Sequence, residues 1–148
     1  MAKYAFITGA SSGIGKATAQ ALATKGYDLV IASRNIEKLE AVKQNIEAAQ
    51  HVAVTPVVLD VTDTAAIHQT TSVVLEKFGA PDVLVNDAGL ARGLEPYDQT
   101  DEEDILEMVD TNIKGLFLVT HAFLPAMVER NSGHIVNQIG RASCRERV

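Results

Sequence analysis

Short apolar runs rich in β-branched residues alternate along the chain with longer segments whose apolar residues recur at helical spacing. The short runs lie at 4–8, 28–33, 52–60, 82–86 and 134–137. Continuous apolar runs of this length are typical of strands buried on both faces of a parallel sheet. Amphipathic helices are predicted between them, at 15–25, 36–49 and 63–78, with Asp63 as the N-cap of the third helix.

Strand and helix follow one another at the spacing of βαβ units. The chain is therefore expected to form an α/β fold, a doubly wound parallel sheet with strand order 3-2-1-4-5. Its 148 residues suffice for one domain. Because domains of this kind often need about 200–250 residues, the sheet is expected to be truncated after the fifth strand.

The last helical region, from Ile105 to Val128, has a different pattern from the other helices. Its apolar residues cover most of the circumference: Val109, Ile113, Leu116, Phe117, Val119, Phe123, Leu124 and Met127. Such a helix is expected to be buried on more than one side, either inside its own domain or in a subunit interface. We favour the interface, and with it a homo-oligomer of the full-length protein. Thr100, followed by Glu103, predicts a capping box at the start of this region.

Composition narrows the range of functions. The net charge is −6, and the absence of a basic patch argues against nucleic acid as a partner. No apolar run reaches transmembrane length and no signal peptide is recognisable, so we expect a cytoplasmic protein without a membrane partner. One cysteine excludes an internal disulfide. The four histidines lack the spacing of ligands, so no metal site is expected.

The glycine-rich segment TGASSGIG directly follows the first strand and opens the first helix. A P-loop requires glycine and a hydroxyl residue at the positions that Ala10 and Ala17 occupy. The spacing Gly9-x-x-x-Gly13-x-Gly15 instead fits a tight turn that presents backbone amides to a pyrophosphate at a helix N-terminus. We therefore expect a Rossmann-type dinucleotide site, and the alternative is an ordinary glycine-rich turn.

Four motifs in this order resemble the short-chain dehydrogenase/reductase family: TGASSGIG, NDAG, DTNIKG and SGHIVN. Within that family, DAGLARGLEP and LPAMVERNSGHIVN are most similar to the NADP-dependent 3-hydroxy acid (serine-type) dehydrogenases. The resemblance implies an NAD(P)-dependent oxidoreductase that transfers hydride between the cofactor and a small hydroxy acid, alcohol or carbonyl substrate.

The resemblance also implies a set of cofactor-binding residues. They are Gly9, Ser11, Ser12, Gly13, Ile14, Gly15, Arg34, Asp60, Val61, Asp87, Ala88 and Gly89. The second strand ends without the acid that binds the ribose 2′-hydroxyl in NAD enzymes, and Arg34 is placed to meet a 2′-phosphate instead. NADP(H) is therefore expected rather than NAD(H), with a solvated surface arginine as the alternative role of Arg34. Asp60 and Val61 stand where the family seats the adenine ring, although Asp60 could equally be a turn residue.

Asp87 departs from the family pattern, which usually has a second asparagine at this place. An ionised carboxylate can only accept hydrogen bonds and brings negative charge near the cofactor. We expect the backbone roles of Ala88 and Gly89 to be retained and the affinity for the cofactor to be reduced.

Asn112 matches the catalytic asparagine of the family, which supports a proton-relay water; the alternative is a polar residue at a helix kink. The resemblance implies a serine at position 140, where this chain has Gly140, and a Tyr-x-x-x-Lys beyond Val148. The chain as given is therefore expected to be inactive. A non-catalytic dinucleotide-binding or regulatory module is the alternative function.

The C-terminal segment does not resemble the family. The peptide from Ile139 to Val148 resembles the translation of a common sequencing adapter. We therefore expect 1–137 to be the N-terminal part of one dinucleotide-binding oxidoreductase domain and 138–148 to be a non-native tail. A genuine short C-terminal variant is the alternative.

Overall fold

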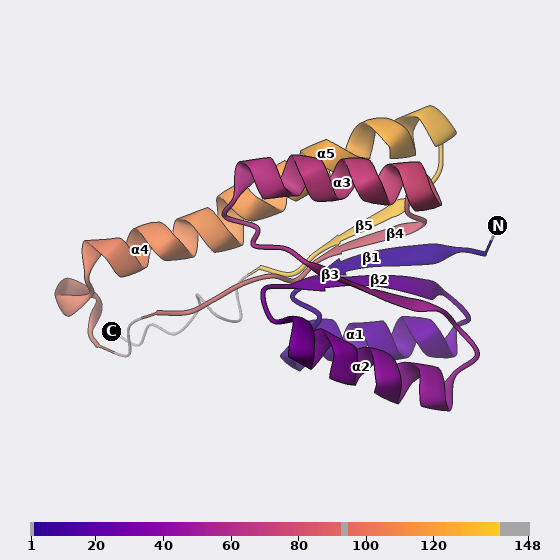
Figure 1. The fold of residues 1–148 in the computed structure, drawn as a ribbon. Coiled ribbons are helices and arrows are strands. Elements are labelled where there is room, and N and C mark those ends of the chain that lie inside the picture. The colour runs from indigo at the N-terminus through magenta and orange to yellow at the C-terminus, as the bar shows by residue number, and fades with distance from the viewer. Residues whose placement is uncertain (1, 93–94, 140–148) are drawn as a thin grey trace.

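The computed structural model describes residues 2–92 and 95–139, and it confirms the expected α/β fold (Figure 1). Its parallel sheet has the predicted order β3-β2-β1-β4-β5. The strands are β1 (Tyr4–Thr8), β2 (Asp28–Ser33), β3 (Val54–Val58), β4 (Val83–Asn86) and β5 (His134–Asn137). In the register, Ala5 lies beside Leu29 of β2 on one side and beside Val83 of β4 on the other. The chain therefore adds β2 and β3 on one side of β1, and then adds β4 and β5 on the other side.

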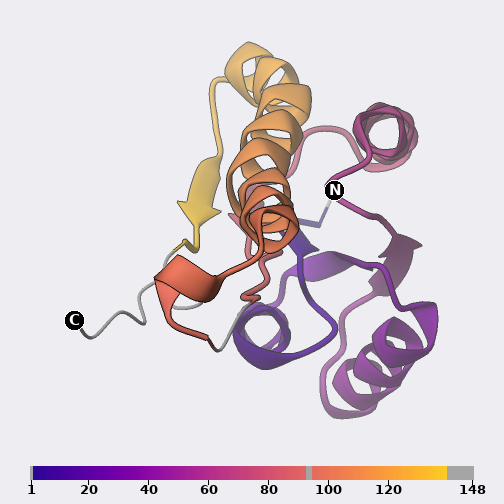
Figure 2. The ribbon, with the colours of Figure 1, turned by 90° about the vertical axis from the view of Figure 1, so that its left-hand side faces the viewer.

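Two layers of helices cover the sheet. Figures 1 and 2 show α1 (Gly13–Thr24) and α2 (Ile36–Ala49) on one face, and α3 (Thr64–Phe78) and α5 (Gly115–Arg130) on the other. Successive residues of β1 alternate between two cores, because strand side chains point to opposite faces. Ile7 packs with the core under α1 and α2, whereas Phe6 packs against Phe123 of α5 with ring centroids 4.6 Å apart.

The predicted helices are close to those observed. The bounds of α2 are as predicted, and α1 begins at Gly13 rather than residue 15. Asp63 caps α3 as expected, since its carboxylate accepts a hydrogen bond of 3.0 Å from the Ala66 amide. The third strand is shorter than the apolar run that predicted it, because only Val54–Val58 pairs with β2.

The last helical region is not one continuous helix. A 3₁₀ turn (η1, Tyr97–Gln99) precedes α4 (Glu102–Val109), and a π-helical segment (η2, Asp110–Lys114) joins α4 to α5. The capping box predicted at Thr100 is wrong. Asp101 is the N-cap, and its carboxylate accepts from the Glu103 amide at 3.1 Å. A carboxylate both fills the capping role and favours the positive end of the helix dipole.

The described residues of this chain bury only one side of the α4–α5 region. Val119 and Phe123 are almost fully buried, whereas Phe117 is 66% exposed. The exposed apolar side chains recur at helical spacing, and we call them the outer apolar stripe: Leu106, Val109, Ile113, Phe117, Leu124 and Val128. The expected burial on more than one side is therefore not provided by the described residues of this chain. Among these residues, none of the helices combines the length and apolar character required to cross a membrane.

Neighbouring valines of α3 provide a test of the core. Val74 is 3% exposed and Val73 is 57% exposed. We expect Val74→Ala to lower the free energy of unfolding by about 2 kcal/mol, because it removes buried methyl groups and leaves a cavity. The matched control Val73→Ala should change it by less than about 0.5 kcal/mol. Urea unfolding of the full-length gene product measures both, and equal losses would contradict the packing described.

Candidate functional site

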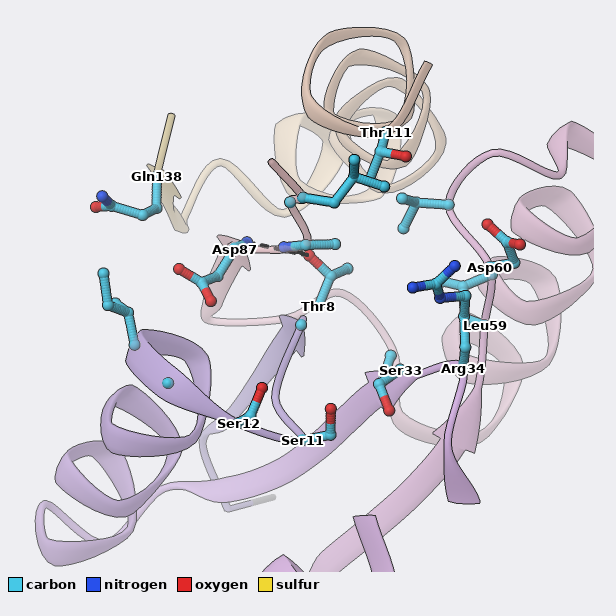
Figure 3. A pocket seen from close by; sticks show the side chains of 18 of the residues that line it. Thr8, Ser11, Ser12, Ser33, Arg34, Leu59, Asp60, Asp87, Thr111 and Gln138 are labelled. Atoms are coloured by element: carbon cyan, nitrogen blue, oxygen red, sulfur yellow. Dashed lines mark hydrogen bonds between the residues drawn. The ribbon is translucent and has the colours of Figure 1, made fainter. Parts of the chain in front are cut away.

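A cleft of about 780 Å³ lies at the carboxyl edge of the sheet, among the loops that follow β1, β2, β3 and β4 (Figure 3). Ligands of open α/β sheets bind at this edge, where the strand order reverses. The cleft brings together most of the residues singled out in the sequence: Gly9, Ser11, Ser12, Gly13, Ile14, Arg34, Asp60, Val61, Asp87, Ala88, Gly89 and Asn112. Gly15 does not line it, but is buried in the wall behind.

Glycine is required where the turn after β1 meets the end of β4. Gly9 has a φ of 67°, and a Cβ there would lie 2.8 Å from the Ala88 nitrogen. A Cβ on Gly15 would collide with the carbonyl oxygen of Gly9 and lie 2.7 Å from the Oδ2 atom of Asp87. The glycine turn therefore brings the start of α1 into direct contact with the end of β4.

The start of α1 has no acceptor of its own. Its N-cap residue, Ser12, makes no side-chain capping hydrogen bond, and the first turn contains no acidic residue. Backbone amides at a helix start carry partial positive charge and bind anions such as phosphate. The arrangement is therefore chemically suited to a phosphate group.

The hydroxyl of Thr8 joins β1 to β4, and sequence reasoning did not single it out. Its oxygen accepts hydrogen bonds of 3.1 Å from the amides of both Asp87 and Ala88. The same hydroxyl lies 3.5 Å from the carbonyl of Val85, to which it donates. The sequence feature that could have identified Thr8 is a hydroxyl residue at the end of a buried strand, immediately before the first glycine.

Asp87 is half-buried, and Figure 3 shows its carboxylate pointing from the end of β4 toward the start of α1. Burial raises the pKa of Asp87 above its ordinary value, and a hydrogen bond from the Gly15 amide offsets only part of that shift. The cleft thus contains a carboxyl group that binds a proton more readily than a free aspartate does.

Arg34 and Asp60 lie together at the other end of the cleft (Figure 3). Asp60 accepts hydrogen bonds from the amide and the hydroxyl of Thr62, at 2.9 and 2.7 Å. Burial tends to raise the pKa of Asp60, but these two bonds and the Arg34 guanidinium outweigh it and lower the pKa below its ordinary value. Lys38, which sequence reasoning missed, adds a second cation to the lining at the start of α2.

Asn112 lies in the π-helical segment and binds the loop after β4. Its Oδ1 accepts from the Leu90 amide and its Nδ2 donates to the Leu90 carbonyl, both at 2.8 Å. A polar residue at a helix irregularity was one of the two roles predicted for it, and the structure places it there. Its catalytic role stays a prediction.

The carboxyl end of β5 also borders the cleft. Gln138 and Ile139 line it, and the Gln138 amide donates to the Asn86 carbonyl at 2.9 Å, which continues the pairing of β4 with β5. Position 140, where a serine was expected, and the rest of the expected tail lie outside the described residues. Within the described ranges there is no cluster of three or more histidine, cysteine or acidic side chains that could hold a metal ion.

The chain matches a family model described as short chain dehydrogenase over residues 3–146. It is 42% identical over 135 residues to an NADP-dependent 3-hydroxy acid dehydrogenase of Salmonella typhi, covering 88% of this chain and 51% of that protein. It is 37% identical to a sulfoacetaldehyde reductase of Chromohalobacter salexigens, with coverages of 95% and 54%. The chain therefore spans about half the length of the curated relatives it matches.

Solved structures share the fold. An alcohol dehydrogenase from the archaeon Thermococcus sibiricus, complexed with 5-hydroxy-NADP, is 35% identical with a TM-score of 0.85, covering 92% of this chain and 57% of that chain. A metagenomic short-chain oxidoreductase in complex with NADP is 34% identical with a TM-score of 0.89. Its alignment covers 98% of this chain and 65% of that chain.

The Thr8 hydroxyl can be tested by an isosteric change. Thr8→Val leaves the amides of Asp87 and Ala88 without their acceptor, so we expect the free energy of unfolding to fall by about 2–4 kcal/mol. Thr8→Ser retains the hydroxyl and is expected to lose less than about 1 kcal/mol. Urea unfolding of the full-length gene product compares the two variants. Equal stability of the two variants would show that the hydroxyl does not hold the strands together.

Proposed function

This chain belongs to the short-chain dehydrogenase family, and we propose that it binds NADP(H) in the cleft as part of an oxidoreductase. The observation that carries this proposal is the pairing of two features along one cleft. At one end the start of α1 has no acceptor of its own, and at the other Arg34 stands where NAD enzymes have an acid.

Within this proposal, different residues of the cleft bind different parts of the cofactor. The diphosphate is held by the backbone amides of Ser12, Gly13 and Ile14 at the start of α1, which attract anions. Arg34 and Lys38 hold the 2′-phosphate, because a guanidinium can bind phosphate with two parallel hydrogen bonds. The adenine ring is assigned to the part of the lining formed by Leu59, Asp60 and Val61: Leu59 supplies an apolar surface and the Asp60 carboxylate is already held by Thr62.

The bound cofactor supplies or accepts hydride, and the chain's own residues position it. The loop after β4 borders the cleft and is fixed to η2 through the paired hydrogen bonds of Asn112 with Leu90. We therefore assign Asn112 to the reacting end of the cleft, with the catalytic role that the family resemblance gives it.

The substrate proposed is a small molecule with a hydroxyl or carbonyl group. Relatives named for 3-hydroxy acids and for sulfoacetaldehyde support this class, since both names denote small acids with such a group. The 148 residues contain no Tyr-x-x-x-Lys, the pair that the family uses for proton transfer. We therefore propose that these residues bind cofactor without turning over substrate, which is the behaviour of a non-catalytic binding module as well.

The outer apolar stripe supports a homo-oligomer of the full-length protein. Its six large side chains are each at least 40% exposed and lie on one side of the α4–α5 region. Exposed apolar surface that is continuous in this way is typical of a protein–protein contact. We assign the stripe to the contact between copies of the chain.

Cofactor choice tests the proposed function. We expect Arg34→Ala to raise the Kd for NADP(H) by about 10- to 100-fold, because charge-assisted hydrogen bonds to the 2′-phosphate are lost. The Kd for NAD(H), which lacks that phosphate, should change little. Isothermal titration calorimetry on the full-length gene product measures both, with Lys25→Ala as a control cation outside the cleft lining. Similar dissociation constants of the unaltered protein for the two cofactors would overturn the assignment of Arg34.

Oligomerisation has a separate test. Phe117→Asp puts a charge in the outer apolar stripe and is expected to convert the oligomer to a monomer, because burying an unpaired carboxylate in a contact is unfavourable. Val73→Asp, at a residue of α3 that is 57% exposed, is the matched control and should leave the oligomer intact. Sedimentation velocity gives the masses. An unchanged mass for Phe117→Asp would remove the stripe from the interface.

A further inference from the structure

Within the described part of the chain, Asp87 is the acidic side chain of the cleft lining that lies against the start of α1. A Cβ built on Gly15, the third residue of that helix, would be 2.7 Å from the Asp87 Oδ2 atom. Asp60, the other acid of the lining, follows β3 and is engaged by Thr62 at the far end of the cleft. The Asp87 carboxylate therefore lies at the place where the glycine turn presents its amides.

The position of Asp87 supplies what α1 lacks within its own sequence. Ser12 provides no side-chain cap and the first turn has no acid, so the negative group that stabilises the helix start comes from Asp87, the residue after β4. The Asp87 amide donates a hydrogen bond of 3.1 Å to the Thr8 hydroxyl. This bond fixes the backbone of Asp87 and so limits how far its side chain can move away from α1. The carboxylate is thus a built-in anion at a site suited to a phosphate.

A dinucleotide diphosphate and an ionised Asp87 would bring negative charge to the same helix start. We propose that Asp87 is a competing anion there, so that binding of the dinucleotide is coupled to uptake of a proton by its carboxyl group. This inference rests on the proposed function, since it concerns the same cleft. Its consequence is that affinity for the cofactor increases as the pH falls.

Among the described residues, few charged groups surround Asp87. The other charged residues of the cleft lining are Arg34, Lys38 and Asp60 at the far end, and Lys16 follows Gly15 in α1. The ends of β1 and β5 contribute uncharged groups: Thr8, Gly9, Gln138 and Ile139. Burial raises the pKa of Asp87 above its ordinary value of 3.8, and the hydrogen bond from the Gly15 amide opposes part of that shift.

The sign of the pH dependence follows from these groups. Bound phosphates disfavour the ionised form, so the pKa of Asp87 is higher in the complex than in the free protein. Affinity for the dinucleotide is greatest at pH values below the pKa that Asp87 has in the free protein. It falls as the pH rises through the interval between the two pKa values, and is constant above that interval.

The test compares the unaltered full-length gene product with Asp87→Asn, an uncharged variant of similar shape that can still accept from the Gly15 amide. NADP(H) binding is titrated calorimetrically between pH 5 and 9, in buffers of different ionisation enthalpy, which gives Kd and the number of protons taken up. The 2′-phosphate of the cofactor titrates in this range as well, at about pH 6 for a phosphate monoester. Because this contribution is common to both proteins, the difference between them isolates Asp87.

We expect Asp87→Asn to bind NADP(H) about tenfold more tightly at high pH, as removal of one nearby like charge predicts, and to take up fewer protons than the unaltered protein. Asp98→Asn, which removes an exposed charge outside the cleft lining, should match the unaltered protein. Asp87→Ser serves as a second uncharged variant if thermal melting shows that Asp87→Asn does not fold.

Two failures are distinguishable. Equal affinity and equal proton uptake in the unaltered protein and a folded Asp87 variant would overturn the competing-anion role, while leaving the cofactor site in place. Absence of NADP(H) binding in every folded protein of the series would overturn the proposed function itself, and with it this inference.

Discussion

The close approach of the ends of β1 and β4 is the contact on which the cleft depends. Gly9 leaves no room for a side chain against the Ala88 backbone, and the Thr8 hydroxyl binds two consecutive amides of the neighbouring strand end. A bulkier turn would push α1 away from β4, and the amides of its first turn would no longer face the same space as the loop after β4. One steric constraint and one hydroxyl therefore bring a helix start, a strand end and a loop into a single wall.

Much of the fold could be predicted because its signals are local. All five residues of β1 are buried, which is why the apolar run indicated a strand covered on both faces. The glycine spacing after it located the turn and the helix start. Asp63 could be recognised as a cap because its partner, Ala66, lies three residues along the chain. In each case the interacting residues are close in sequence, so a pattern of residue types sufficed.

The parts that could not be predicted depend on contacts between distant residues. Asn112 binds Leu90, which is 22 positions away, and this pairing accompanies the π-helical segment that divides the expected helix. Helical periodicity alone cannot show such a widening, because apolar residues on both sides of it still fall on one face. The Thr8 hydroxyl, whose partners lie 79 and 80 positions away, was missed for the same reason. The capping error at Thr100 differs, since Asp101 beside it was an equally local and stronger candidate.

In the proposed site, the two ends of the cleft affect different properties of dinucleotide binding. NADP and NAD share the diphosphate, so the proposed competition from the Asp87 carboxylate would act on both alike and would change affinity without discriminating between them. The 2′-phosphate belongs to NADP alone, and we assign it to the end of the cleft whose described lining contains Arg34 and Lys38. Asp60 lies beside Arg34 at this end, and its carboxylate accepts two hydrogen bonds from Thr62. In the proposed site, selectivity and affinity are therefore assigned to residues from different strand ends, and we expect a change at one end to leave the other property intact.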